Sequence, residues 1–350
     1  MFFVPFCGLR KKTSLEANTW NMSNAVWVYV PDVMRYSILF ILLVIVGCVV
    51  PDTRAQTPDL AVRYFASGEK KFAEHDWIAA ADNFTKAIQT NARLKGVKPA
   101  KGGNAFDDSQ AEATEISVSD TFTAHAYVNR GAARFYGGAL DQSIADYDRA
   151  LRIAPRLAQA YLGRGTALNA KGDRVGAMRD YNRALKLDNS LYEAYNNRGA
   201  LSHDLGDLEN AMSDLNQAVS INPKGAEAYF HRGYVLIAKN DLAAAITDFN
   251  RCIELKPEYA WAWQGRGTAL MKQGRLEPAM KDFSAAIELD PSIAEAHANR
   301  GMILILLGKA TEASRDLKKG MELKPEAKAD IEKRAALAKR IRDAAVVAKQ

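Results

Sequence analysis

Apolar residues recur along most of this chain at spacings of three and four residues, the pattern of amphipathic helices. In the stretch 192–225, Tyr195 and Gly199 begin one apolar stripe. A second stripe follows, formed by Leu208, Ala211, Leu215 and Val219. Two short helices joined by a turn are therefore predicted here. Because one such pair cannot bury its own apolar face, neighbouring pairs are expected to stack into a continuous core.

The same pattern returns every 34 residues, and four kinds of residue keep that period. Arginine followed by glycine occurs at Arg130-Gly131, Arg164-Gly165, Arg198-Gly199, Arg232-Gly233, Arg266-Gly267 and Arg300-Gly301. Aspartate recurs at Asp146, Asp180, Asp214, Asp248, Asp282 and Asp316. Alanine recurs at Ala177, Ala211, Ala245 and Ala279, and proline at Pro155, Pro223, Pro257 and Pro291. We place the repeats at 61–94, 124–157, 158–191, 192–225, 226–259, 260–293 and 294–327.

These positions resemble the tetratricopeptide repeat family, in which each repeat folds as two antiparallel helices. The resemblance implies an all-α fold, an α-solenoid of about seven tandem helix-turn-helix repeats wound as a right-handed superhelix. The first repeat is the weakest copy, carrying Tyr64, Gly68, Ala80, Phe84 and Ala87 at the family's positions. The resemblance covers 61–94 and 124–327, and it is specific for fold but not for ligand.

Each signature residue has a physical reason to be where it is. Glycine at the eighth position lets two helices cross closely, and a large side chain there would cost ~1–3 kcal/mol. Glycine at the turn, as in Gly172 and Gly206, suits the left-handed conformation that ends a helix. Asp173, Asp207 and Asp241 follow where an N-cap is expected, each worth ~1 kcal/mol. The late proline stops the second helix.

The recurring Arg and Asp side chains predict a structural ion-pair ladder rather than a functional array. The first repeat has Ser67 in place of the Arg and Asn83 in place of the Asp, so both are lost together. We expect each Arg to pair with the Asp of its own repeat.

Two segments flank or interrupt the repeats. Residues 95–123 are polar, with Gly102-Gly103 and Asp107-Asp108, and form an insertion after the first repeat. Residues 328–350 predict a C-terminal capping helix. Its apolar stripe consists of Ile331, Ala335, Ala338, Ile341 and Ala345. A basic helix that contacts an anionic membrane or a partner is the alternative.

Residues 1–55 are interpreted as a targeting segment because of the apolar run at 36–50. Its uninterrupted part is shorter than the ~18 residues of a membrane-spanning helix. It suits the central region of a signal peptide instead. Met22 and Met34 are alternatives to Met1 as the start of the protein. A further alternative to a targeting segment is that residues 1–55 result from a wrongly assigned start and that the protein is cytosolic.

Three processing routes stay open for this segment. Signal peptidase cleavage would leave a mature chain that begins at Gln56. Ile45-Val46-Gly47-Cys48 resembles a bacterial lipobox, which would attach lipid to Cys48. An uncleaved anchor is favoured by Arg10-Lys11-Lys12. All three place the repeats outside the cytoplasm, in the periplasm or beyond.

The formal charge of +6 lies in the tails. Residues 1–55 have a net charge of +2 and residues 328–350 a net charge of +4, so the repeats and insertion balance to zero. A nucleic-acid binder should carry a basic face on its folded body. Nucleic acid is therefore not expected as a partner.

No residues suggest catalysis, a metal or another cofactor. The five histidines fall at five different repeat positions, without metal-ligand spacing. Cys252 is the one cysteine outside the targeting segment, which excludes an internal disulfide and a structural zinc site. No nucleophile motif is present, and too few residues lie outside the repeats for a catalytic domain.

The resemblance implies a ligand groove along the first helix of each repeat. The matching positions hold Asn129, Asn196, Asn197, His203, His231, Tyr234, Trp261, Gln264, Lys272 and Asn299. Asparagines could bond an extended peptide backbone, while Tyr234 and Trp261 could anchor side chains. A solvated groove without a ligand is the alternative. A carboxylate clamp for chaperone tails is not expected, because such a clamp needs several basic residues and these positions hold one, Lys272.

The sequence thus predicts a non-enzymatic scaffold or adaptor of the bacterial cell envelope that binds a peptide or protein. A self-associating structural solenoid, which would be a homo-oligomer, is the main alternative. A regulatory subunit of an envelope enzyme complex is a further one.

Overall fold

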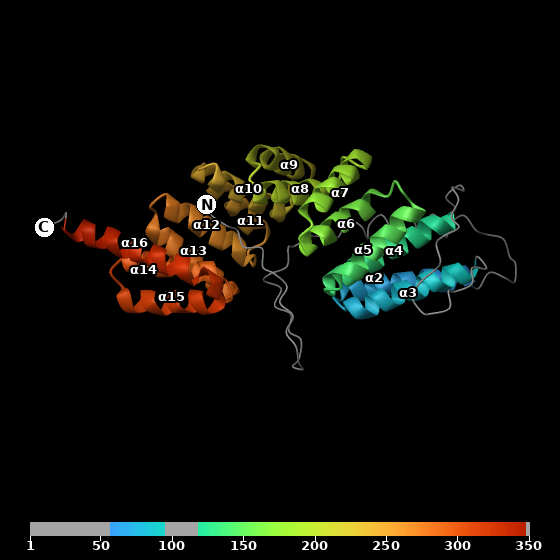
Figure 1. Cartoon of the computed structure of the whole chain (residues 1–350), viewed down its shortest axis with the longest axis horizontal. Coiled ribbons are helices and arrows are strands. Elements are labelled where there is room, and N and C mark those ends of the chain that lie inside the picture. The colour runs from blue at the N-terminus through green and yellow to red at the C-terminus, as the bar shows by residue number, and fades with distance from the viewer. Residues whose placement is uncertain (1–56, 95–117, 348–350) are drawn as a thin grey trace. The chain divides into compact units, whose positions relative to one another are not determined.

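A computed structural model describes residues 57–94 and 118–347 of the chain (Figure 1). Within these ranges the secondary structure is entirely helical, without a strand. The targeting segment 1–55 and most of the insertion lie outside the described residues. None of the helices in the described ranges is long and apolar enough to span a membrane.

Seven antiparallel helix pairs follow one another, as the sequence predicted, so the expected all-α repeat fold is confirmed. The pairs are α2 (Thr57–Ala73) with α3 (Trp77–Leu94), α4 (Val118–Tyr136) with α5 (Leu140–Ile153), α6 (Ala158–Lys171) with α7 (Arg174–Leu187), α8 (Tyr192–Asp204) with α9 (Leu208–Ile221), α10 (Ala226–Ala238) with α11 (Leu242–Leu255), α12 (Ala260–Lys272) with α13 (Leu276–Leu289), and α14 (Ala294–Leu306) with α15 (Ala310–Leu323). A short 3₁₀ turn, η2 (Pro325–Ala327), leads into α16 (Lys328–Val347).

The chain divides into two compact units, and the division falls inside α8, between Arg198 and Gly199. One unit contains α2 to α7 and the start of α8. The other contains the rest of α8 and α9 to α16. Each unit is described by itself, so the handedness of the superhelix stays a prediction.

The turns between paired helices use the residues that the sequence places there. Gly172 and Gly206 adopt φ of +94° and +82°, the left-handed conformation in which a Cβ would be strained. Asp173, one residue later, accepts a hydrogen bond from the Gly176 backbone N–H at 2.8 Å. In the fifth repeat Asn240 takes the left-handed conformation instead of glycine, with φ of +61°.

Close crossing of paired helices explains the eighth-position glycines. A Cβ on Gly165 would lie 2.9 Å from the ring of Tyr181, and one on Gly267 would lie 2.9 Å from the ring of Phe283. The core alanines Ala177, Ala211, Ala245 and Ala279 are all fully buried. Helices α5, α9, α11 and α13 each end two residues before Pro155, Pro223, Pro257 and Pro291 respectively.

The predicted insertion 95–123 is shorter in the structure, because α4 already begins at Val118. Phe122 explains the difference. Its ring centroid lies 5.3 Å from that of Phe65 on α2, so the residues before the repeat are drawn into the core of this unit.

The stripe predicted for the capping helix is buried only along its first half. Ile331 and Ala338 of α16 are buried and pack against Met302 of α14. Ile341, in contrast, is 54% exposed, and Ala345 is also exposed. The helix therefore extends beyond the helix pair that it covers. The spacing of apolar residues shows which face of α16 is apolar, but not how far along the helix that face is covered.

Candidate functional site

The asparagines predicted to line a ligand groove are buried. Asn129, Asn196, Asn197 and Asn299 are between 3% and 6% exposed. Little of each side chain is open to solvent in this structure. The asparagine-lined groove stays a prediction.

Polar side chains on first helices instead bond to one another across repeats. Asn197 donates to Thr166 Oγ1 at 3.3 Å, which joins α8 to α6. In the other unit, Tyr234 of α10 donates to Gln264 Oε1 of α12 at 2.5 Å. Arg334 of α16 donates to Asn299 Oδ1 at 2.5 Å. The first two bonds tie adjacent first helices together, and the third ties α16 to α14.

Four predicted groove residues of α10 and α12 are less buried than the asparagines. His231, Tyr234 and Trp261 are half-buried, and Lys272 is exposed. Burial lowers the pKa of His231 to about 4, so its imidazole is neutral at physiological pH. Neighbouring Phe230 stacks edge-to-face on Tyr234, with 5.0 Å between ring centroids. This face of the second unit is therefore aromatic and largely uncharged.

The Arg and Asp of each repeat form a bidentate pair wherever both lie in one unit. Arg164 Nε and Nη2 donate to Asp180 Oδ2 and Oδ1 at 2.7 and 2.8 Å. The same two bonds join Arg130 to Asp146, Arg232 to Asp248, Arg266 to Asp282, and Arg300 to Asp316. We call this series the Arg–Asp ladder. Arg198 and Asp214 fall in different units, and their pairing stays a prediction.

Each ladder arginine also reaches back to the preceding repeat, a contact that sequence reasoning missed. Arg164 Nη1 donates to Asp148 at 2.6 Å, and Arg266 Nη1 donates to Asn250 at 2.7 Å, in both cases sixteen residues earlier. Corresponding bonds join Arg198 to Asn182, Arg232 to Asn216, and Arg300 to Ser284. The guanidinium therefore links two second helices, since its planar fork can serve both. The sequence signal that could have revealed this contact is the polar residue that stands sixteen positions before each of these arginines.

The aromatic residue at the fourth position completes this arrangement. The Arg266 guanidinium lies 4.7 Å from the centroid of the Trp263 ring, within the range of a cation–π contact. Trp263 Nε1 donates to the Pro257 carbonyl at 2.8 Å, which ties α12 to the turn that follows α11. In the seventh repeat His297 replaces the aromatic residue, and its Nε2 lies 3.1 Å from the Pro291 carbonyl oxygen.

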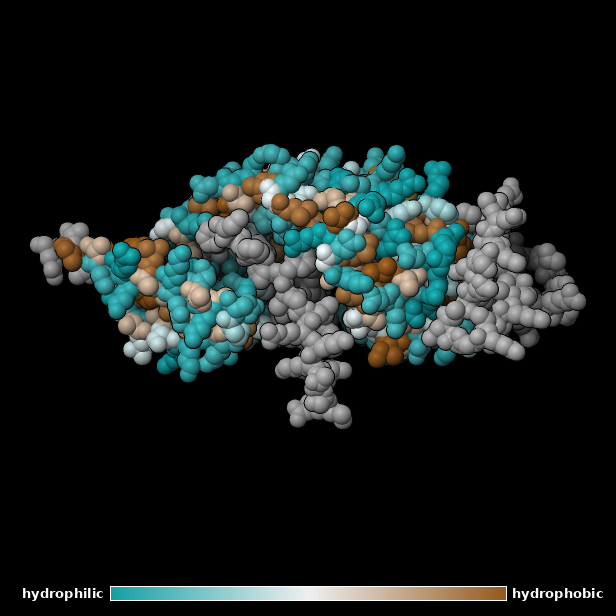
Figure 2. Space-filling view, viewed as in Figure 1, coloured by the Kyte–Doolittle hydropathy of each residue, from teal (hydrophilic) through white to brown (hydrophobic). Residues whose placement is uncertain are grey.

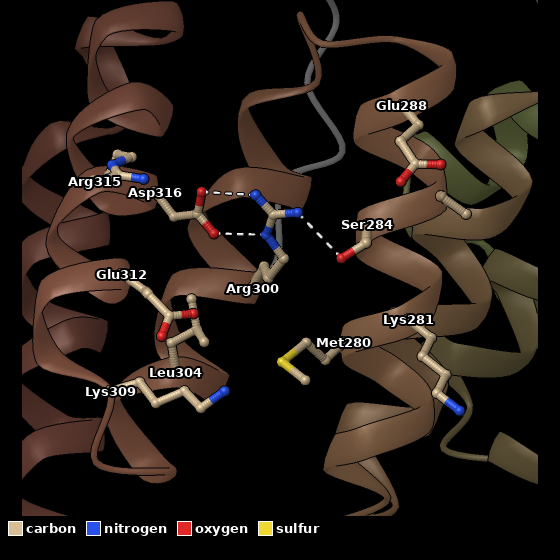
Figure 3. Close-up of a pocket in the computed structure, with 11 residues that line it drawn as sticks. Met280, Lys281, Ser284, Glu288, Arg300, Leu304, Lys309, Glu312, Arg315 and Asp316 are labelled. Carbon is tan, nitrogen blue, oxygen red and sulfur yellow. Dashed lines mark hydrogen bonds and ion pairs between the residues drawn. The ribbon is translucent and has the colours of Figure 1, made fainter.

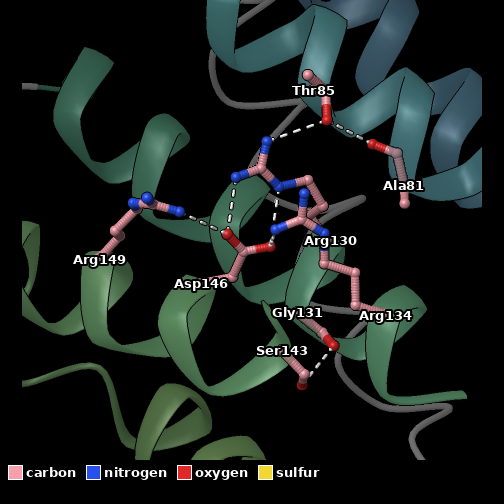
Figure 4. Close-up of polar contacts among 8 residues, drawn as sticks. All are labelled: Ala81, Thr85, Arg130, Gly131, Arg134, Ser143, Asp146 and Arg149. Atoms are coloured by element: carbon pink, nitrogen blue, oxygen red, sulfur yellow. Dashed lines mark hydrogen bonds and ion pairs between the residues drawn. The ribbon is translucent and has the colours of Figure 1, made fainter. Parts of the chain in front are cut away.

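The ladder position at Asp146 differs from the others because three arginines surround one carboxylate (Figure 4). Besides Arg130, Arg134 Nη1 donates to Asp146 Oδ2 at 2.7 Å, and Arg149 Nη1 lies 3.4 Å from Asp146 Oδ1. Arg130 also donates to Thr85 Oγ1 of α3 at 3.0 Å. We call Arg130, Arg134, Arg149 and Asp146 the Asp146 cluster.

A pocket of about 540 Å³ lies beside the last ladder position, between α13 and α15 over α14 (Figure 3). Met280, Ala285 and Leu304 give it an apolar wall, and Lys281 and Lys309 project at one end. Ser284 and Ala285 stand where the fifth repeat carries the larger Asn250 and Arg251. We call this cavity the α13–α15 pocket. It is open because Ser284 and Ala285 are small.

On the face that Figure 2 shows, side chains are mostly hydrophilic, and hydrophobic patches lie between them. No group of three or more His, Cys, Asp or Glu residues within 57–94 and 118–347 could hold a metal ion. Burial raises the pKa of Cys252 to about 12, so its thiol stays protonated and unreactive.

Tandem, stacked helix pairs with a 34-residue period define the chain as an α-solenoid repeat protein. Models of the tetratricopeptide repeat match residues 260–293 and 294–327, and a model described as TPR repeat matches 201–238 and 233–274. Residues 201–327 are therefore tetratricopeptide repeats. None of the curated proteins matches the chain.

Solved structures of tetratricopeptide proteins are similar in fold. A tetratricopeptide repeat protein from Parabacteroides merdae is 18% identical with a TM-score of 0.55, and the match covers 79% of this chain and 99% of that chain. PilF of Pseudomonas aeruginosa is 19% identical with a TM-score of 0.52, covering 58% of this chain and 92% of that one. MamA is 28% identical with a TM-score of 0.41, covering 46% and 95%. Repeats of this family generally form protein-interaction scaffolds, and the family is typically not enzymatic.

Proposed function

We propose that the chain is an adaptor that binds an extended segment of a partner protein across the first helices α10 and α12. The observation that carries this proposal is that Tyr234, Trp261 and Lys272, on the adjacent first helices α10 and α12, are less buried than the asparagines.

The chemistry of this face suits a peptide with apolar and acidic side chains. Tyrosine and tryptophan supply large contact areas at little cost in side-chain entropy, and they dominate the binding energy of many interfaces. Tyr234 is held in place by its bond to Gln264, so its ring is already ordered before a partner arrives. The exposed Lys272 would face a carboxylate of the partner.

Site-specific photo-crosslinking in a bacterial host would test this proposal. We would replace Lys272 with p-benzoylphenylalanine in the full chain, and place the same group at Arg251 on the second helix α11 as the matched control. A discrete adduct from position 272 and none from 251 is expected. Equal adducts from both positions, or none from 272, would contradict the proposal.

The adduct supplies the sequence needed for a direct affinity measurement. A labelled peptide from the cross-linked segment should bind the purified chain, and Tyr234→Ala should weaken it by about tenfold, or ~1.4 kcal/mol. Val175→Ala, at an exposed apolar position on α7, should leave the affinity unchanged.

We also propose that the adaptor acts in the bacterial cell envelope. The apolar run at 36–50 supports this location, through cleavage before Gln56, lipidation of Cys48 or an uncleaved anchor. Intact mass of the protein from membrane and soluble fractions distinguishes the three routes. A soluble, unprocessed chain would contradict the proposed location while leaving the peptide site untouched.

Self-association is the second candidate function, favoured by the exposed second half of α16. Leu337 and Ile341 are each 54% exposed and lie one helical turn apart. A second copy could cover this stripe, in competition with repulsion among the surrounding basic residues. Sedimentation at increasing protein concentration should then show a dimer that Leu337→Glu abolishes. A monomer at every concentration would exclude this candidate.

A further inference from the structure

The excess positive charge of the described chain lies on α16, its last helix. Residues 56–327 balance to zero, whereas Lys328–Val347 hold six basic residues against three acidic ones. All three acids have a basic partner on the same helix: Asp330 with Arg334, Glu332 with Lys328, and Asp343 with Arg342. Three exposed bases remain that form no ion pair with any residue of 57–94 or 118–347: Lys333, Lys339 and Arg340.

Two of these bases share one face of α16 with exposed apolar side chains. Residues three, four and seven positions from Leu337 lie on the same side of the helix as Leu337 itself. That side holds Lys333, Leu337, Arg340, Ile341 and Ala344, which we call the Leu337 face. Leu337 and Ile341 are each 54% exposed, and the second half of α16 extends past α14 and α15 (Figure 1). The helix pair that packs on the first half of α16 therefore leaves this face uncovered.

Acidic charge is nearly absent from the Leu337 face. Glu332 and Asp343 are five and six residues from Leu337, a spacing that turns both well away from it. Asp330 is seven residues before Leu337 and shares the face, but it lies 3.5 Å from Arg334. Among the described residues, the face thus presents apolar side chains between bases that no acid balances.

We propose that the Leu337 face binds an anionic lipid surface. A basic helix with an apolar stripe lies in the plane of the membrane, and its apolar side chains enter the boundary between headgroups and acyl chains. Leu337 and Ile341 supply that stripe. Lys333 and Arg340, on the same face, meet the negative charge of the lipid phosphates.

The charge of the face selects this partner over a second copy of the chain. Two copies paired through the Leu337 face would bring like-charged bases together, and an anionic lipid surface reverses this repulsion. Nucleic acid would balance the bases but leave Leu337 and Ile341 uncovered, because its backbone offers phosphates without an apolar layer. The proposal does not depend on the peptide face of α10 and α12.

Exposed positions supply variants that should keep the fold. Lys333→Glu reverses one charge on the face, and Lys319→Glu makes the same change at an exposed lysine of α15 as its matched control. Leu337→Ser removes one apolar side chain from the face. Leu289→Ser, at a position on α13 that is 45% exposed, is the control for that change.

Because the full chain also contains the apolar run at 36–50, the readout must be local to α16. An environment-sensitive fluorescent amino acid replaces Ala344 on the Leu337 face and, in a second sample, Ser314 on α15. Emission from position 344 should shift to the blue with vesicles of phosphatidylcholine and phosphatidylglycerol, and far less with phosphatidylcholine alone. Position 314 should not respond, and added salt should weaken the response at position 344.

We expect Lys333→Glu and Leu337→Ser each to weaken the affinity for the anionic vesicles about tenfold, equivalent to ~1.4 kcal/mol. Lys319→Glu and Leu289→Ser should leave this affinity unchanged. A loss in Lys333→Glu with none in Leu337→Ser would contradict the proposal, since the stripe would then contribute nothing.

Three further outcomes would overturn the proposal: no shift at position 344 with the anionic vesicles, an equal shift with phosphatidylcholine alone, or equal losses in the controls. A blue shift that grows with protein concentration in the absence of vesicles would assign the Leu337 face to a second copy instead. Cross-linking from position 272 tests the peptide face separately, so either proposal can fail without the other.

Discussion

The ladder positions at Asp146 and at Asp316 occupy the same place in their repeats, yet their surroundings differ. Asp146 is fully enclosed and contacts three arginines, Arg130, Arg134 and Arg149. Asp316 pairs with Arg300 and lies 3.6 Å from His297, and the α13–α15 pocket opens beside it. The same structural pair thus lies among three guanidinium groups in one unit and borders an open pocket in the other.

The difference arises from positions that the repeat leaves unconstrained. The bidentate pair needs one Arg and one Asp, and it is the same in both places. The eleventh and twenty-sixth positions decide what surrounds it. They hold Arg134 and Arg149 in the first case, and Leu304 and Lys319 in the second. Repeat proteins can therefore vary a local environment without changing the scaffold.

The largest expected effect is the loss of the carboxylate at Asp146. Asp146→Asn would leave buried guanidinium groups without their counter-charge, which typically costs about 3–5 kcal/mol. Asp316→Asn should cost less, ~1–3 kcal/mol, because its ion pair is partly open to solvent. Urea denaturation followed by circular dichroism would measure both. Equal losses would show that the enclosure of Asp146 does not matter.

A double-mutant cycle tests whether the ladder pairs act directly. Arg232→Met and Asp248→Asn should be non-additive, with a coupling of about 0.5–3 kcal/mol in the free energy of unfolding. Arg232→Met combined with Asp282→Asn, from a different repeat, is the additive control. Additivity in both cycles would refute direct pairing.

The acid response should distinguish Asp316. Burial alone would raise the pKa of Asp316, but the two hydrogen bonds and the charge of Arg300, with the His297 ring close by, outweigh it and lower the pKa to about 2. A lowered pKa in the folded state stabilises the fold above the unfolded value near 4, and this stability disappears as the pH falls from about 4 to about 2. Unfolding free energies measured across this window should fall less steeply in Asp316→Asn than in the wild type. Identical pH slopes would contradict the assignment.

The smallest expected effect is that of filling the α13–α15 pocket. Ala285→Arg introduces the residue found at this position in three other repeats, as Arg149, Arg183 and Arg251. The change in unfolding free energy should stay within about 0.5 kcal/mol, since the site is at the surface. Gln217→Arg, which makes a similar charge change in the fourth repeat, provides the comparison. A loss above ~2 kcal/mol from Ala285→Arg alone would mean that the small residues are needed for packing.

The repeat and its helix pairs could be predicted from the amino-acid sequence. Glycine at Gly165 and Gly267, aspartate caps such as Asp173 and the recurring prolines act within one repeat, through backbone geometry and contacts between helices adjacent in sequence. Such contacts recur with the period, and a period of 34 residues can be read directly from the chain.

Contacts between repeats could not be predicted in the same way, because they depend on how the helix pairs pack in space. The second bond of each ladder arginine, such as Arg266 to Asn250, depends on how one second helix lies beside the next. The same stacking buried Asn197 against Thr166, although the sequence suggested a ligand-facing amide. It also left Ile341 of α16 uncovered. Within the second repeat, the packing of α4 against α5 brought Arg134 and Arg149 to one carboxylate. Periodicity tells which face of a helix is apolar, whereas the distance and angle between neighbouring helices determine which polar side chains meet.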